Sequence, residues 1–228
     1  MGGVCVEWRK WLPRPRGEQK NGPISALPQH NPADRPLTRS QKCSNQRIIR
    51  GSLKYFAYGS NMLTERLRGR CASANALGRA TVGNHVLEFC KRSADGSGKA
   101  TIVQSRKDGT RVYGVVFNLD IAEREELDKA EGLGQGYHRV DDLGVQLEIG
   151  DEVRVSTYIG TRLDRSLKPY DWYRALVIAG AQEHELPGEW IAMLEQVACI
   201  PDPDFKRKNR VDAIAVLKGA GFEHLVQR

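Results

Sequence analysis

The sequence has 228 residues, of which 40% are hydrophobic, and a formal net charge of +7. This length allows one large domain or two small ones, and the hydrophobic fraction is sufficient for a core that needs no metal or disulfide. No apolar run approaches the roughly 18 residues of a membrane span, and the N-terminus lacks the apolar segment of a secretory signal. We therefore expect a cytoplasmic protein with no membrane partner.

The excess positive charge is confined to the N-terminal part of the chain. Residues 1–50 contain ten lysines and arginines but three acidic residues, which leaves 25 of each sign for residues 51–228. A nucleic-acid-binding domain usually carries a basic stripe of its own, so we expect no nucleic-acid partner for the neutral part. Six of the ten prolines also lie in residues 1–50. This composition predicts a disordered basic extension followed by one folded domain over residues 51–228.

The cysteines are scattered along the chain. They form no C-x-x-C pair and have no histidine at a metal-ligand spacing. The five positions are Cys5, Cys43, Cys71, Cys90 and Cys199. Such a set is typical of free thiols in a reducing cytosol, and we expect no metal site.

The first predicted elements are a strand and a short helix. Residues 53–59 read as a strand that ends at Gly59, and residues 61–69 read as one or two helical turns. Asn61 is a suitable N-cap for this helix, and Gly69 is a suitable stop.

Further strands follow before the longer helices. The strand-like runs are 84–92, 100–119, 137–148 and 152–160, and Asp108-Gly109 predicts a hairpin tip within the second run. Helices are predicted over 122–132, over 169–187 with a stop near Gly180, over 187–200 starting at Pro187, and over 210–222. Strands first and helices later indicate an α+β domain, built as a small mixed barrel or curved sheet with helices packed outside.

Two features could carry chemistry. The turn Gly59-Ser60-Asn61 exposes several backbone N–H groups, which suit a carboxylate or a developing oxyanion. Glu131 ends a predicted helix between Ala130 and Gly132, where the helix dipole disfavours a negative charge and would raise the carboxyl pKa. A raised pKa is what a general base needs near neutral pH. Both features also have a purely structural interpretation, as a turn after a strand and as a surface acid before a C-cap glycine.

Other motifs fit known sites poorly. Ser60 lacks the flanking glycines of the G-x-S-x-G nucleophile elbow. The glycines at 132, 134 and 136 follow a helix and lead into a strand, which is the wrong order for a dinucleotide-binding loop. The histidines lie in different elements and share no spacing.

Several separate stretches occur in one recognisable order. They are YFAYGSNM (55–62), ATIVQS with VYGVVF, LDKAEG with GYHRV, and YRALVIAGAQEHELP (173–187). Over residues 53–200 the chain resembles the gamma-glutamylcyclotransferase family, also called the AIG2-like group. The resemblance implies a small barrel of six strands or a similar number, helices outside it, and the YGSNM loop at the mouth of a cavity.

The resemblance also implies a reaction in which a γ-glutamyl amide cyclises to 5-oxoproline and releases an amino acid or amine. The α-amine of the substrate attacks its own γ-carbonyl, and Glu131 removes and later returns the proton. The implied substrate-binding residues are Tyr58, Gly59, Ser60, Asn61, Met62, Tyr137 and Tyr173, where Met62 replaces a common leucine. Tyr137 and Arg139 match a Tyr-x-Arg strand pattern of the family. No cofactor is implied.

Three functions remain open on this basis. An enzyme acting on a small γ-glutamyl substrate, as a monomer or homodimer, agrees best with the presence of Glu131. A non-catalytic member of the family would keep the cavity as a ligand-binding or regulatory module. Nucleic-acid binding through the basic extension is the third, and the neutral domain disfavours it.

Overall fold

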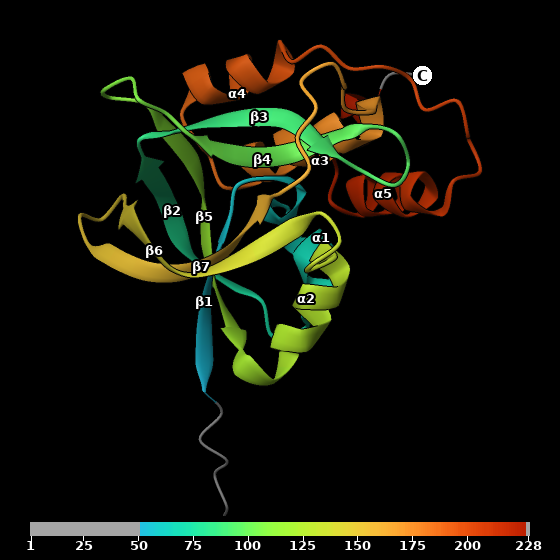
Figure 1. Cartoon of the computed structure of the whole chain (residues 1–228). Coiled ribbons are helices and arrows are strands. Elements are labelled where there is room, and N and C mark those ends of the chain that lie inside the picture. Colours follow the sequence, from blue (N-terminus) through green and yellow to red (C-terminus); the bar gives the residue numbers. More distant parts are fainter. Residues whose placement is uncertain (1–50, 227–228) are drawn as a thin grey trace, which may run out of the picture. The chain divides into compact units, whose positions relative to one another are not determined.

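A closed barrel of five strands lies at the centre of the computed structural model, which describes residues 51–226 (Figure 1). The predicted extension over residues 1–50 lies outside the described residues. Around the barrel the strands are β1 (Ser52–Ala57), β5 (Arg111–Asp120), β2 (Asn75–Gly83), β6 (Tyr137–Leu147) and β7 (Glu152–Gly160). Neighbours pair antiparallel, except that β1 and β7 close the barrel as a parallel pair. The expected α+β fold with a small mixed barrel is confirmed.

Strand β5 holds the barrel together. It pairs with β1 along one edge and with β2 along the other. Consecutive residues of β5 are buried, so both faces of this strand are covered. Gly114 is required within it, because an added Cβ would lie 2.3 Å from the carbonyl oxygen of Ala57 and 2.7 Å from the ring of Phe56.

A second, two-stranded sheet consists of β3 (His85–Arg92) and β4 (Gly98–Gln104). The predicted hairpin across Asp108-Gly109 is therefore wrong, because β4 and β5 belong to different sheets. The turn itself forms, with Gly109 at a φ of 76°. Both edges of β5 are occupied by β1 and β2, and a local turn signal does not specify which strand is the partner.

The helices lie outside the barrel. They are α1 (Thr64–Arg68), α2 (Arg124–Glu131), α3 (Asp171–Glu183), α4 (Gly188–Glu195) and α5 (Lys208–Gly219), with 3-10 turns η2 (Ser60–Met62), η3 (Ile121–Glu123) and η4 (Glu223–Leu225). Figure 1 shows α1 and α2 beside the barrel and α3 near the β3–β4 sheet. Helix α3 is buried along nearly its whole length and contacts η2, α4 and α5. Within residues 51–226, no helix is long and apolar enough to cross a bilayer.

The predicted helix stop near Gly180 is wrong, because α3 continues to Glu183. Gly180 instead permits a close approach between α3 and the turn η2. An added Cβ would lie 2.4 Å from the backbone nitrogen of Leu63 and 2.6 Å from the Cβ of Met62. The glycine therefore sets the distance between the buried helix and the loop after β1.

We expect Gly180→Ala to lower the free energy of unfolding by about 1–3 kcal/mol, because the new methyl group overlaps the backbone at Leu63. Gly219→Ala is the matched control, since an added Cβ there meets nothing within 4 Å at the end of α5. Urea unfolding of both variants checks the prediction. Equal stability of the two variants would contradict the role given to Gly180.

Candidate active site

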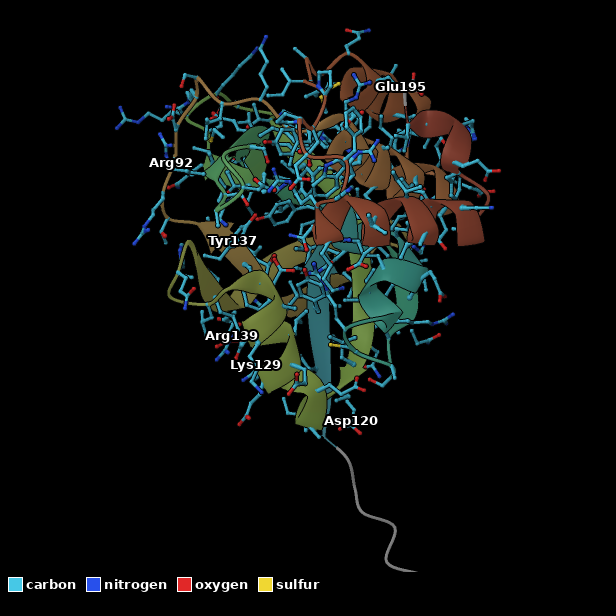
Figure 2. All side chains as sticks on the ribbon, turned by 90° about the vertical axis from the view of Figure 1, so that its right-hand side faces the viewer. Arg92, Asp120, Lys129, Tyr137, Arg139 and Glu195 are labelled. Carbon is cyan, nitrogen blue, oxygen red and sulfur yellow. The ribbon has the colours of Figure 1, made fainter. Side chains whose placement is uncertain are left out.

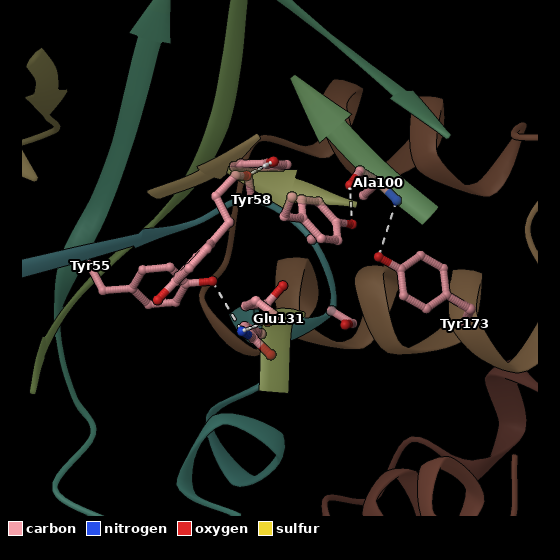
Figure 3. Close-up of a pocket in the computed structure, with 10 residues that line it drawn as sticks. Tyr55, Tyr58, Ala100, Glu131 and Tyr173 are labelled. Carbon is pink, nitrogen blue, oxygen red and sulfur yellow. Dashed lines mark hydrogen bonds between the residues drawn. The ribbon is translucent and has the colours of Figure 1, made fainter. Parts of the chain in front are cut away.

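One pocket, partly open to solvent, brings together residues from both predicted features (Figure 3). Its lining consists of Tyr55, Tyr58, Gly59, Ser60, Asn61, Ala100, Glu131, Tyr137, Tyr158 and Tyr173. Every predicted site residue except Met62 and Arg139 is in this set. The end of β1, the end of α2, the strand β4 and the helix α3 all contribute to the pocket.

The loop after β1 forms the backbone side of the pocket. A Cβ on Gly59 would lie 3.2 Å from the Cβ of Ala100 and 3.5 Å from the hydroxyl oxygen of Tyr173, so a glycine lets the loop pass beneath these residues. The Met62 N–H donates to the Gly59 carbonyl at 3.0 Å and closes the turn η2. The N–H groups of Ser60 and Asn61, at the start of this turn, have no acceptor within it.

The prediction that Asn61 caps a helix is wrong, and the residue lines the pocket instead. Helix α1 starts at Thr64 with Leu63 in the N-cap position. The Asn61 Nδ2 donates to the Tyr55 hydroxyl at 3.0 Å and to Glu131 Oε1 at 2.8 Å. Its Oδ1 accepts a hydrogen bond from Arg70 Nη1 at 2.8 Å. These three contacts fix the orientation of the amide.

The two carboxylate oxygens of Glu131 have different hydrogen-bond surroundings. It is the last residue of α2, and Gly132 ends that helix with a φ of 68°. Oε1 accepts from Asn61 and, at 2.5 Å, from Arg70 Nη1. Oε2 has no hydrogen-bond partner among the described residues. One oxygen is therefore held by fixed donors, and the other is free to exchange a proton with a ligand.

Tyrosines form the remaining wall of the pocket (Figure 3). The Tyr173 hydroxyl accepts from the N–H of Ala100 at 3.1 Å, and the Tyr137 hydroxyl donates to the Ala100 carbonyl at 2.9 Å. The Tyr58 hydroxyl donates to the carbonyl of Tyr158. Burial, and then the negative charge of Glu131, raises the pKa of Tyr58. Burial is also the main cause that raises the pKa of Tyr137 and Tyr173, so these phenols stay neutral near pH 7.

Comparison with known proteins identifies the family of the chain. Residues 111–194 match the model of the AIG2-like family. Gamma-glutamylcyclotransferase from Homo sapiens is 34% identical over 151 residues, which are 64% of this chain and 79% of the human protein. The protein of that name from Mus musculus is 33% identical over 159 residues, or 68% of this chain and 81% of the mouse protein. The chain belongs to the gamma-glutamylcyclotransferase family.

The three-dimensional comparison supports the same family. A solved structure of a gamma-glutamyl cyclotransferase superposes with a TM-score of 0.66 and 30% sequence identity. The match covers 74% of this chain and 100% of that chain. The similarity therefore extends over the entire solved relative.

Two predicted residues lie outside the pocket of this gamma-glutamylcyclotransferase family member. Met62 is fully buried, its N–H is used within η2, and its side chain packs against Gly180. Arg139 runs alongside α2 (Figure 2) and pairs with Asp128 at 2.6 Å. Asp128 in turn accepts from the Tyr158 hydroxyl at 2.7 Å. Arg139 thus supports the tyrosine wall from outside the pocket.

Arg70 is the main residue that sequence reasoning missed. It follows α1 and lies nine positions after Asn61, yet it reaches both Asn61 and Glu131. No short motif marks it, because its role depends on how the segment after α1 folds back toward α2. Tyr55 and Tyr158 were also missed as pocket residues, since alternation along a strand predicts burial but not which face borders a cavity.

We expect Arg70→Met to lower the free energy of unfolding by about 1–3 kcal/mol, because it leaves the Glu131 carboxylate without its cation partner. The range extends down to about 1 kcal/mol because solvent screens a partly exposed ion pair. The Arg70 side chain is 22% exposed and the Glu131 side chain is 15% exposed. Lys129→Met is the matched control on α2, as its ion pair with Glu126 is exposed. Chemical unfolding of both variants is the measurement, and a control that loses as much stability would refute the role of Arg70.

Proposed function

We propose that the protein is a γ-glutamyl cyclotransferase of the cytoplasm, which converts a γ-glutamyl amino acid or γ-glutamyl amine to 5-oxoproline. The free amino acid or amine is the second product. The observation that carries this proposal is that Glu131 lines the same pocket as Ser60 and Asn61 and that its Oε2 has no hydrogen-bond partner among the described residues. Membership in the family supports the same reaction.

The first requirement of the reaction is a folded substrate. The α-amine nitrogen attacks the γ-carbonyl carbon of the same molecule, so a C–N bond forms and closes a five-membered ring. A pocket that holds the glutamyl chain bent converts its flexibility into a high effective concentration of the nucleophile, which can lower a barrier by about 7–11 kcal/mol. The tyrosine side chains around the pocket suit this positioning role because buried hydroxyls hold them in place.

The second requirement is proton transfer. An ammonium group cannot attack a carbonyl, so the α-amine first loses one proton to solvent, and its nitrogen loses a second proton as the new C–N bond forms. Glu131 Oε2 takes this proton, and the same carboxyl then gives it to the leaving nitrogen when the original C–N bond breaks. Asn61 and Arg70 hold Oε1 throughout, which keeps Oε2 directed at the substrate.

The third requirement is stabilisation of negative charge. The tetrahedral intermediate carries an oxyanion, and the substrate carries an α-carboxylate. The N–H groups of Gly59, Ser60 and Asn61 provide preorganised donors for one or both of these groups. Their positions follow from the backbone, so no side chain has to move during the reaction.

A ligand-binding module without catalysis is the competing function. Such a module would need the backbone donors but not a free carboxylate oxygen beside them. The pairing of Oε1 alone, with Oε2 left open, favours catalysis.

We expect Glu131→Gln to lower kcat/KM for γ-glutamyl-L-alanine by about 10²- to 10⁴-fold, because an amide neither accepts nor returns the proton. The assay is release of 5-oxoproline, measured by mass spectrometry. Glu126→Gln on the exposed face of α2 is the control and should keep wild-type activity. Normal turnover by Glu131→Gln would show that another residue is the base.

Calorimetry of the wild-type protein with γ-glutamyl-L-alanine tests the competing function. Binding in the calorimeter would support the binding module if no γ-glutamyl amino acid or amine offered releases 5-oxoproline.

A further inference from the structure

Two lysines face each other across the β3–β4 sheet. Lys91 and Lys99 are directly opposed in the strand register, so their side chains lie on the same face. Like charges in this arrangement destabilise a sheet. Lys99 is compensated, because its Nζ pairs with Asp95 at 2.9 Å and lies 4.4 Å from the ring centroid of Trp172 and 4.5 Å from that of Tyr173.

The side chain of Lys91 is held in a groove made by two glycines. A Cβ on Gly160, the last residue of β7, would lie 2.8 Å from Lys91 Cγ. A Cβ on Gly136, just before β6, would lie 2.8 Å from Cε and 3.1 Å from Nζ. The ammonium group ends 4.3 Å from the ring centroid of Tyr137, which lines the pocket. The glycines thus direct this cation to the edge of the candidate active site.

Lys91 remains without a close anionic partner. No carboxylate among the described residues forms an ion pair with it. Glu131 and Asp95 attract it from a distance, but both are already paired with other cations, and Arg162 repels it. Partial burial desolvates the ammonium group and lowers the pKa of Lys91. Such a cation beside a pocket can be neutralised by an anionic group of a ligand.

The orientation of the substrate identifies that group. If Glu131 acts on the α-amine, the glutamyl part occupies the pocket that Tyr137 lines, and the Lys91 ammonium group lies against the ring of that tyrosine. We propose that the leaving part extends past Tyr137, where Lys91 binds the carboxylate of the leaving amino acid. This inference rests on the proposed cyclotransferase function and assigns its specificity to a residue outside the pocket lining.

The test compares two substrates that differ by one carboxylate, γ-glutamyl-L-alanine and γ-glutamyl-ethylamide. The readout is the ratio of their kcat/KM values, measured by 5-oxoproline release. We expect Lys91→Met to lower this ratio about 10- to 100-fold, mainly through a higher KM for the alanine compound, as loss of one charge-assisted hydrogen bond predicts. Lys107→Met, at an exposed position before β5, should keep the wild-type ratio.

A second variant, Lys91→Gln, keeps a polar side chain and should change the ratio in the same direction. Thermal melts show that each variant is folded, and removal of one of two opposed cations should not lower the melting temperature. An unchanged ratio in both Lys91 variants, with an active wild type, overturns this inference alone. Absence of product from both substrates with the wild type overturns the proposed function, and the inference falls with it.

Discussion

The hydrogen bonds that Glu131 Oε1 accepts from Asn61 and Arg70 join three parts of the chain that are distant in sequence. They connect the loop after β1, the segment after α1 and the end of α2. The Asn61 side chain also accepts a hydrogen bond from Arg70 and donates one to Tyr55. These contacts hold the side chains of the cluster in place. A partly buried carboxylate needs such donors, and the arrangement satisfies one oxygen while the other remains available to a ligand.

Close backbone approach supplies the second constraint on the pocket. Gly180 lets α3 contact the turn η2, and Gly59 lets the loop pass under Ala100 and Tyr173. Tyr173 then binds the main chain of Ala100, which connects α3 to the β3–β4 sheet. The pocket is therefore built where the barrel, the small sheet and the buried helix meet. Its tyrosines stay neutral, so charge in the pocket is concentrated on Glu131.

Local sequence signals predicted much of this architecture. Gly132 marked the end of α2, Pro187 the start of α4, and the alternating runs the strands β6 and β7. The errors occurred where a local signal has two readings. Gly180 was interpreted as a helix stop, although it lies within α3 where the helix packs closely against η2. Asn61 was interpreted as an N-cap, although its side-chain amide forms hydrogen bonds with Tyr55, Arg70 and Glu131.

By itself, the sequence determined the element types, the candidate loop and the acid at the end of a helix, because propensity, turn chemistry and motif order act over a few residues. Through the family resemblance it also indicated a reaction class. Only the tertiary structure decided that Arg70 contacts both Asn61 and Glu131. It also decided that Met62 and Arg139 lie outside the pocket and that Lys91 lies at the edge of the pocket. Those outcomes depend on which strands pair and how closely backbones pack, and both are set by contacts between residues far apart in the chain.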